Sequence, residues 1–104
     1  MANICSNELR IFWDSPIDTD EVDEKYFLDI EKVFDKYFQY YEVADSDSGY
    51  MNIFFDSKWD FPRLALEDLI EKLHDKNEIS MQCLSVEWGN NYCEFHNYRD
   101  GEWV

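Results

Sequence analysis

The fold is decided by the stretch DTDEVDEKYFLDIEKVFDKYFQYY, residues 18–41. Its apolar residues recur at steps of three and four, the spacing of one face of an α-helix. They are Val22, Tyr26, Ile30, Val33, Phe34, Tyr37, Phe38 and Tyr41. The charged residues on the other side are Glu21, Glu24, Glu31 and Asp35, with Lys25, Lys32 and Lys36. The stretch therefore predicts an amphipathic helix that buries its stripe on a sheet and turns a negative side to water.

A strand is expected before this helix. Residues 4–13 alternate between apolar and polar side chains, which is typical of a strand with one buried face. The start of the helix is marked by Asp18, Thr19 and Asp20, any of which can cap it. The chain therefore opens with a strand followed by a helix.

A hairpin and a second helix are expected next. The aromatic residues after the first helix predict a strand at about residues 40–44. Turn-forming residues at 45–49 lead into a second strand at residues 50–57. Asp60 is expected to cap a helix that has Pro62 in its first turn, where the missing N–H has no cost.

The last third of the chain completes the predicted fold. The second helix is expected to end near Lys76 and Asn77, and residues 79–88, 92–98 and 102–104 read as strands. The order strand, helix, strand, strand, helix, strand is that of the ferredoxin-like βαββαβ plan. The sequence therefore predicts an α+β fold, with an antiparallel sheet, two helices on one face and an extra C-terminal hairpin strand.

Composition limits the classes of function. The chain has 104 residues, enough for one core, and we expect one domain spanning residues 1–104. Hydrophobic residues make up 45% and aromatic residues 18%, which argues for a folded chain. Twenty-four acidic against nine basic residues give a formal net charge of −15. This sign disfavours direct binding to nucleic acid and favours a basic protein partner.

Targeting signals and cysteines indicate the compartment. No apolar run approaches the length of about 20 residues that spans a bilayer, and no basic segment precedes an apolar one at the N-terminus. Cys5, Cys83 and Cys93 form no CxxC pair, so they fit reduced thiols that are buried in the core or the sheet. We therefore expect a soluble, cytoplasmic protein.

The chain opens with MANICSNELRI, and this segment resembles a known signature. Asn3, Cys5 and Asn7 match an M-x-N-W-C-x-N pattern, which runs into the first strand of a plasmid- and phage-borne family of ferredoxin-like domains of unknown function. Ile4 replaces the tryptophan of the pattern, and Trp13-Asp14 stands where a glycine is usual. The resemblance implies the same fold and a mobile-element setting, and it carries no catalytic residues.

No residue pattern predicts catalysis, a cofactor or a metal. His74 falls in the last turn of the second predicted helix, where it suits the helix dipole. Alternation places Cys93 and His96 on opposite faces of the sheet, which does not suit a zinc site. A Cys–His pair for nucleophilic catalysis would need the fold to bring a cysteine beside His96. We expect a protein that is not an enzyme.

Acidic residues that crowd the start of the first helix and the hairpin are the sharpest feature. Those expected to contact a basic partner are Asp14, Asp18, Asp20, Glu21, Asp23, Glu24, Asp45 and Asp47. Aromatic residues exceed what a small core encloses, so Trp59 and Trp103 are the expected anchors. The alternative is that the acids only keep the chain soluble.

We therefore hypothesise a small acidic inhibitor that blocks the basic, nucleic-acid-binding surface of a partner protein. By charge, size and setting it resembles the DNA-mimic, anti-CRISPR and anti-restriction inhibitors of phages and plasmids, which implies a CRISPR or restriction effector as the partner. The alternative hypothesis is a ferredoxin-like domain that binds a small ligand or has a regulatory role, as a monomer or as a dimer.

Overall fold

Eight elements make up the part of the chain described by the computed structural model. The described residues are 4–13, 20–38, 40–47, 49–58, 62–73, 79–87, 89, 92–99 and 101–104. In chain order the elements are β1 (Ile4–Phe12), α1 (Asp20–Tyr37), β2 (Tyr41–Asp47), β3 (Tyr50–Lys58), α2 (Arg63–Lys72), β4 (Ser80–Glu87), β5 (Tyr92–Arg99) and β6 (Glu102–Trp103).

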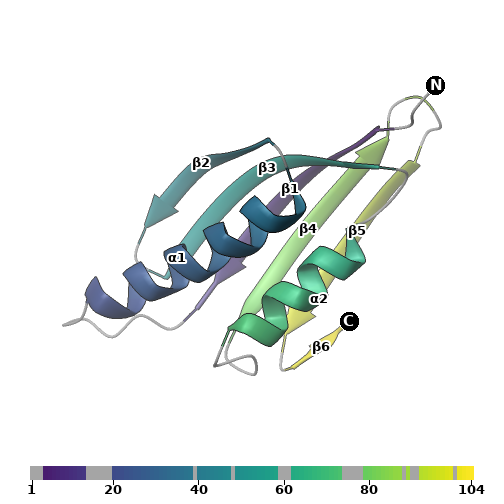
Figure 1. Cartoon of the computed structure of the whole chain (residues 1–104). Helices are drawn as coiled ribbons and strands as arrows, with labels where there is room; N and C mark the ends of the chain where they lie inside the picture. Colours follow the sequence, from purple (N-terminus) through teal and green to yellow (C-terminus); the bar gives the residue numbers. More distant parts are fainter. Residues whose placement is uncertain are drawn as a thin grey trace.

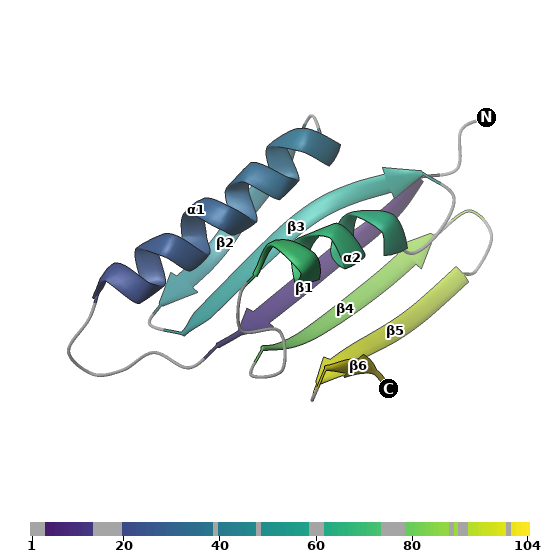
Figure 2. The ribbon, with the colours of Figure 1, turned by 60° about the horizontal axis from the view of Figure 1, so that its bottom comes forward.

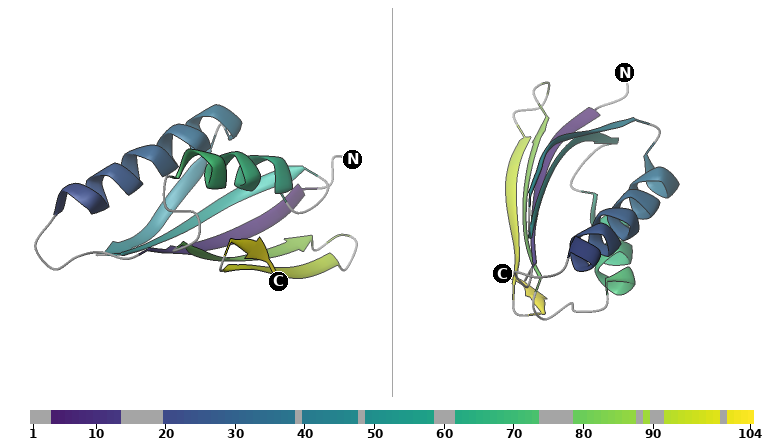
Figure 3. Two further views of the ribbon diagram at one scale, coloured as in Figure 1. Left: turned by 90° about the horizontal axis from the view of Figure 1, so that it is seen from below. Right: turned by 90° about the vertical axis from the view of Figure 1, so that its left-hand side faces the viewer.

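The strands form one antiparallel sheet of six strands with the spatial order β2-β3-β1-β4-β5-β6. Both helices lie on the same face of this sheet (Figures 1 and 3). The α+β class and the placement of the helices are as predicted. The four strands of the ferredoxin-like plan do not account for the whole sheet, because β5 and β6 extend it beyond β4.

Alternation along the strands builds the floor of the core. The buried core residues of the strands are Leu9, Ile11, Met51, Ile53, Phe55, Met81, Cys83 and Tyr98. The helices add Tyr26, Ile30, Val33, Phe34, Leu66, Leu69 and Ile70. Partly buried residues packed against this core are Phe27, Phe38, Tyr41 and Trp103. Removal of this apolar surface from water, worth roughly 25 cal/mol per Å², holds the helices on the sheet.

The N-terminal half of α1 is attached to the sheet by Asp23. Its Oδ1 accepts the indole N–H of Trp13 at 2.8 Å and the backbone N–H of Gly49 at 3.1 Å. The Trp13 ring also stacks on Tyr26, with ring centroids 4.9 Å apart, and its backbone N–H donates to the carbonyl of Gly49. The φ of Gly49 is 74°, a conformation that favours glycine. One carboxylate thus joins the end of β1, α1 and the β2–β3 turn.

A second buried polar cluster crosses β3, β1 and β4. The Asn7 amide donates to the carbonyl of Phe55 at 3.3 Å and to Ser57 Oγ at 3.0 Å, and Ser85 Oγ donates to Asn7 Oδ1 at 2.6 Å. Cys5 is fully buried on the same side of β1. Cys5 and Asn7, the described residues of the N-terminal signature, are therefore interior residues of the sheet.

The strand β2 is longer than predicted. It continues through Asp47 instead of ending near residue 44, because Asp45 pairs with Asn52 and Asp47 with Tyr50. The register shifts between Val43 and Asp45, which marks a β-bulge. The turn formers at 45–47 are therefore strand residues, and the hairpin turn is shorter than their composition suggested.

The helix α2 is shorter than predicted. Leu73 follows it in an extended conformation, with φ −84° and ψ 127°, so the helix ends before the predicted limit. Pro62 is the N-cap residue, and no side chain of the described residues caps this end. The predicted cap Asp60 and the predicted end at Lys76 and Asn77 lie outside the described residues.

Asp23→Ala is expected to lower the free energy of unfolding by about 1–3 kcal/mol, because two N–H groups, from Trp13 and Gly49, lose their acceptor. Asp23→Asn retains an Oδ1 acceptor and should cost less. Glu24→Ala, at the exposed neighbouring position, is the control, with an effect within about 0.5 kcal/mol. Urea unfolding measures all three, and equal effects of Asp23→Ala and Glu24→Ala would contradict the assignment.

Candidate interaction surface

The outer side of α1 is divided into two flanks that differ in charge. The acidic flank consists of Glu24, Glu31 and Asp35. The lysine flank consists of Lys25, Lys32 and Lys36. Each lysine follows an acid by one residue, which places the two flanks about 100° apart around the helix. Asp29, four residues after Lys25 and three before Lys32, lies on the lysine flank, so the acidic flank carries acids alone and the lysine flank carries both signs.

Neighbouring elements fix the direction of each flank. The phenol of Tyr41 on β2 donates to Asp35 Oδ1 at 2.7 Å. Lys36 Nζ and the Tyr37 phenol donate to Asp68 Oδ2 on α2, at 3.2 and 3.0 Å. In Figure 1, α1 is drawn between β2 and α2. The acidic flank therefore faces β2, and the lysine flank faces α2.

The strand β2 continues the negative charge at the margin of the sheet. It is the terminal strand of the sheet order, and every residue after Tyr41 is exposed. We define the acidic edge as Glu24, Glu31 and Asp35 of α1 with Glu42, Asp45 and Asp47 of β2. Within the described part of the chain, no lysine or arginine forms an ion pair with Glu24, Glu31, Asp35, Glu42 or Asp45. The charges of these five acids are therefore not offset by a lysine or arginine of the described residues.

Two carboxylates of the acidic edge affect the pKa of Tyr41. Burial, the hydrogen bond to Asp35 and the negative charges of Asp35 and Glu31 together raise the pKa of Tyr41 to about 12. Each of these effects disfavours a phenolate beside carboxylates. The phenol therefore stays neutral well above neutral pH and remains the donor to Asp35.

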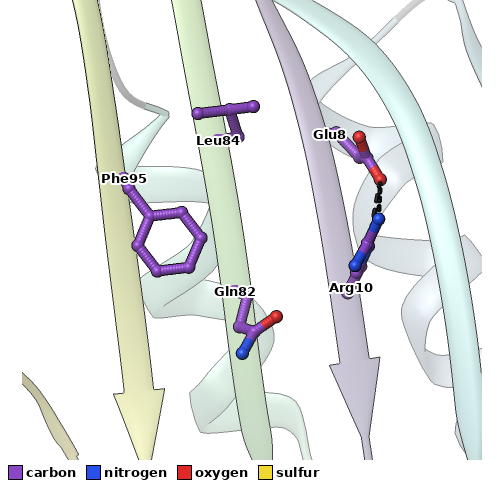
Figure 4. Close-up of a pocket in the computed structure, with 5 residues that line it drawn as sticks. All are labelled: Glu8, Arg10, Gln82, Leu84 and Phe95. Carbon is purple, nitrogen blue, oxygen red and sulfur yellow. Dashed lines mark hydrogen bonds and ion pairs between the residues drawn. The ribbon is translucent and has the colours of Figure 1, made fainter.

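The sheet face opposite the helices is partly apolar, and no described helix covers it. Its exposed apolar residues include Phe12, Phe54, Leu84 and Phe95. A shallow hollow of about 160 Å³ on this face is lined by Glu8, Arg10, Gln82, Leu84 and Phe95 (Figure 4). Arg10 is already paired with Glu8 at 3.0 Å. The hollow is smaller than the roughly 300–1,000 Å³ of most ligand pockets.

The structure describes only some of the residues that were predicted to contact a partner. Asp14, Asp18 and Trp59 lie outside the described residues, and so do the side chains of Asp20 and Glu21. The exposed members of the predicted set are Glu24, Asp45 and Asp47, which belong to the acidic edge. Trp103 is partly buried, with its ring centroid 5.3 Å from that of Tyr98.

The assignment of Asp23 to partner binding is corrected. Only 7% of Asp23 is exposed, because its carboxylate accepts the hydrogen bonds from Trp13 and Gly49 inside the protein. A partner cannot reach this carboxylate without disrupting α1. Of the adjacent acids Asp23 and Glu24, only Glu24 is available at the surface.

Cys83 and His96 are neighbours in the sheet, but the thiol is not activated. The β4–β5 register sets Cys83 opposite His96, but burial raises the pKa of the Cys83 thiol to about 12, so it is a poor nucleophile. His96 Nε2 lies 2.7 Å from Glu94 Oε2. Cys93 is exposed, which corrects the expected burial. No three His, Cys, Asp or Glu side chains among the described residues could hold a metal, and His74 lies outside that part.

Glu31 and Asp35 were expected on the outer side of the first helix, but neither they nor Glu42 were among the residues predicted to contact a partner. The available signal was that Glu24, Glu31 and Asp35 recur at helical spacing on one side of α1. The three lysines have the same spacing, shifted by one position. The contribution of β2 had no such signal, since the predicted strand ended before Asp45. Pairing across the hairpin, which composition does not reveal, decides that boundary.

Comparisons with known proteins do not assign a family. The chain matches no protein-family model, no curated protein and no solved structure. Neither of the described helices has the length and apolar character needed to cross a membrane. The function is therefore inferred from the acidic edge and the surfaces beside it.

Glu31→Gln and Asp35→Asn should each lower the pKa of Tyr41 from about 12 toward 10, because each removes a negative charge from the phenol. Since the folded pKa is raised, the stability that Tyr41 contributes is fully present below about pH 10 and is lost as pH rises toward 12. Absorbance titration at 295 nm, compared with Tyr41→Phe, isolates this tyrosine. Glu94→Gln is the control. An unchanged pKa in both acidic variants would contradict the proximity of these charges.

Proposed function

We propose that this chain is a small, acidic, non-enzymatic protein of the cytoplasm, which docks on the basic, nucleic-acid-binding surface of a partner protein and blocks it. The observation that carries the proposal is the acidic flank of α1, which bears three acids and no lysine and meets β2 at Asp35, whereas Lys36 on the other flank reaches α2. Charge that serves solubility alone can be spread evenly over a surface. Charge gathered on one side produces a directional field that orients a basic partner.

The dimensions of the acidic edge suit a surface that binds a nucleic-acid backbone. From Glu24 to Asp35 the acidic flank of α1 extends over roughly 16 Å, at the rise of an α-helix. Successive phosphates of one DNA strand are about 3.4 Å apart along the helix axis. The acidic flank is therefore about as long as five phosphate steps. Glu42, Asp45 and Asp47 add negative charge on the neighbouring margin strand, where they pair with Phe54, Asn52 and Tyr50 of the open sheet face. A lysine- and arginine-rich groove can engage these carboxylates in place of phosphates.

The binding residues in this proposal differ in part from those expected from the sequence. Asp23 is left out because it is buried, whereas Glu31, Asp35 and Glu42 are added. Asp14, Asp18, Asp20, Glu21 and Trp59 remain expectations from the sequence. Because opposite fields steer encounter and are screened by ions, association should be fast and strongly weakened by salt.

The ferredoxin-like plan and a mobile-element origin belong to the same proposal. The neighbouring strands β2-β3-β1-β4, with two helices on one face, support a ferredoxin-like core to which β5 and β6 are added. The N-terminal signature supports this plan through Cys5 and Asn7, which pack inside the sheet. A setting on plasmids or phages favours a CRISPR or restriction effector as the partner.

A second candidate function is a dimeric or ligand-binding regulatory domain. The open sheet face favours it, because Phe95 is 60% exposed and Phe54 is 43% exposed there. Against a dimer through this face stands the repulsion between two chains that each carry a charge of −15. Sedimentation velocity at low and high salt distinguishes the two: a monomer at both favours docking, and a dimer that persists at both favours the regulatory domain.

The docking proposal is tested with two variants of equal net charge. Glu42→Gln/Asp45→Asn removes two acids from the β2 margin, and Glu94→Gln/Glu102→Gln removes two from the opposite margin. Each protein is immobilised and used to capture basic proteins from a nuclease-treated host lysate at low and high salt. The captured protein is then assayed for displacement of a labelled DNA duplex by each variant in solution.

Wild type and Glu94→Gln/Glu102→Gln should displace the duplex equally, and Glu42→Gln/Asp45→Asn should need at least about tenfold higher concentration. This difference is expected because only the first pair of acids belongs to the acidic edge. Equal displacement by all three proteins would mean that the acidic edge does not contact the partner. A captured partner that keeps its duplex would remove the inhibitory function.

A further inference from the structure

A groove of about 410 Å³ lies between α2 and the β5–β6 hairpin, on the side of the sheet that carries the helices. The helix contributes Glu67, Asp68 and Glu71, and the hairpin contributes Tyr98 and Trp103. In Figure 2, β6 and the end of β5 lie below α2, on the opposite side of the molecule from β2. The groove is therefore separate from the acidic edge.

The floor of this groove is aromatic. Tyr98 is 2% exposed, and its ring meets that of Trp103 at 65° with centroids 5.3 Å apart. Trp103 is only partly buried, so part of its indole borders the groove. Gly101, in the turn between the two strands, also lines the groove and has no side chain to narrow it. Trp103 is thus the aromatic ring of the floor that an organic cation can reach, and Tyr98 supports it from below.

The carboxylates above this floor differ in how they are engaged. Asp68 binds Lys36 and Lys72, and its pKa is lowered by hydrogen bonds from Tyr37 and Lys36. Glu67 lies 3.8 Å from Arg63 of the same helix. These acids are largely neutralised by the protein itself.

Glu71 is different, because within the described part of the chain it forms no ion pair. Glu71 is exposed. Burial raises the pKa of Tyr98, and the negative charge of Glu71 raises it further, which places that charge near the groove floor. The groove therefore combines an aromatic floor with one carboxylate open to a ligand.

This combination selects the chemistry of the ligand. A guanidinium group is flat and weakly hydrated, so it can lie on an indole ring while its N–H groups pair with a carboxylate. A metal ion would need several convergent oxygen ligands, and Glu67, Asp68 and Glu71 do not converge in this way among the described residues. A neutral side chain would leave Glu71 without a partner. The groove volume is also sufficient for one long side chain, but not for a folded element.

We propose that this groove receives an arginine side chain of the basic partner, with the guanidinium stacked on Trp103 and paired with Glu71. The inference rests on the proposed function, because a basic partner supplies the arginine. It gives that partner a second point of attachment, away from the acidic edge, and it makes the orientation of the complex specific.

The test uses a small probe, so it does not depend on finding the partner. N-acetyl-arginine amide is titrated into the protein while the indole N–H signals are followed by NMR, with the Trp103 signal assigned from Trp103→Phe. N-acetyl-citrulline amide, which has nearly the same shape without the charge, and N-acetyl-lysine amide are titrated in parallel. The arginine probe should shift the Trp103 signal with about millimolar affinity, and the citrulline probe should not.

Glu71→Gln should weaken the arginine probe by about 1.5- to fivefold, the range expected for one exposed ion pair. Glu24→Gln removes the same charge from the acidic edge and should leave this affinity unchanged. The inference is overturned if citrulline shifts Trp103 as arginine does, if lysine binds as tightly as arginine, or if Glu71→Gln has no effect.

The two proposals can fail separately. If the arginine probe binds at Glu71 but no partner is displaced from DNA by the acidic edge, the groove stands and the inhibitory function falls. If displacement depends on Glu42 and Asp45 but the probe does not bind, the acidic edge stands and the groove falls. A partner that tolerates Glu71→Gln would likewise count against the groove.

Discussion

The placement of α1 on the sheet depends on one buried carboxylate. Asp23 accepts hydrogen bonds from Trp13 and from Gly49, and so holds α1 against both the end of β1 and the hairpin turn. A carboxylate is costly to bury unless it is hydrogen-bonded in this way. The bonds also fix the rotation of α1 about its axis. A rotation of about 100°, one residue of the helix, would turn lysines instead of acids toward β2.

The distribution of charge over the surface depends on which acids the few lysines contact. Lys36 and Lys72 both reach Asp68: Lys36 connects α1 to α2, and Lys72 pairs with Asp68 within α2. Little positive charge is then left for the far flank of α1, where Glu31 and Asp35 stand beside Tyr41. Negative charge is therefore least compensated on the flank of α1 that faces β2. This uneven distribution of charge results from how α1 packs beside α2.

Much of the fold could be predicted from local patterns. The alternation in β1 and the three- and four-residue steps of α1 are set by backbone geometry, which sequence displays directly. The role of Asp23 could not be predicted, because the acids from Asp20 to Glu24 look alike until the indole of Trp13 is known to need an acceptor. The groove near Glu71 was missed for a similar reason: it exists only where β6 returns beside α2, a contact between distant segments.

The bulge in β2 has a consequence for how copies of this protein behave toward one another. A terminal strand carries backbone groups that another chain could use to extend the sheet. Here the irregularity between Val43 and Asp45 interrupts the ladder, and the carboxylates of Glu42 and Asp45 repel an identical strand. The same margin can therefore attract basic side chains while it resists strand addition and fibre growth. Neutralising those carboxylates, by acid or by substitution, would remove one of these two barriers and leave only the bulge.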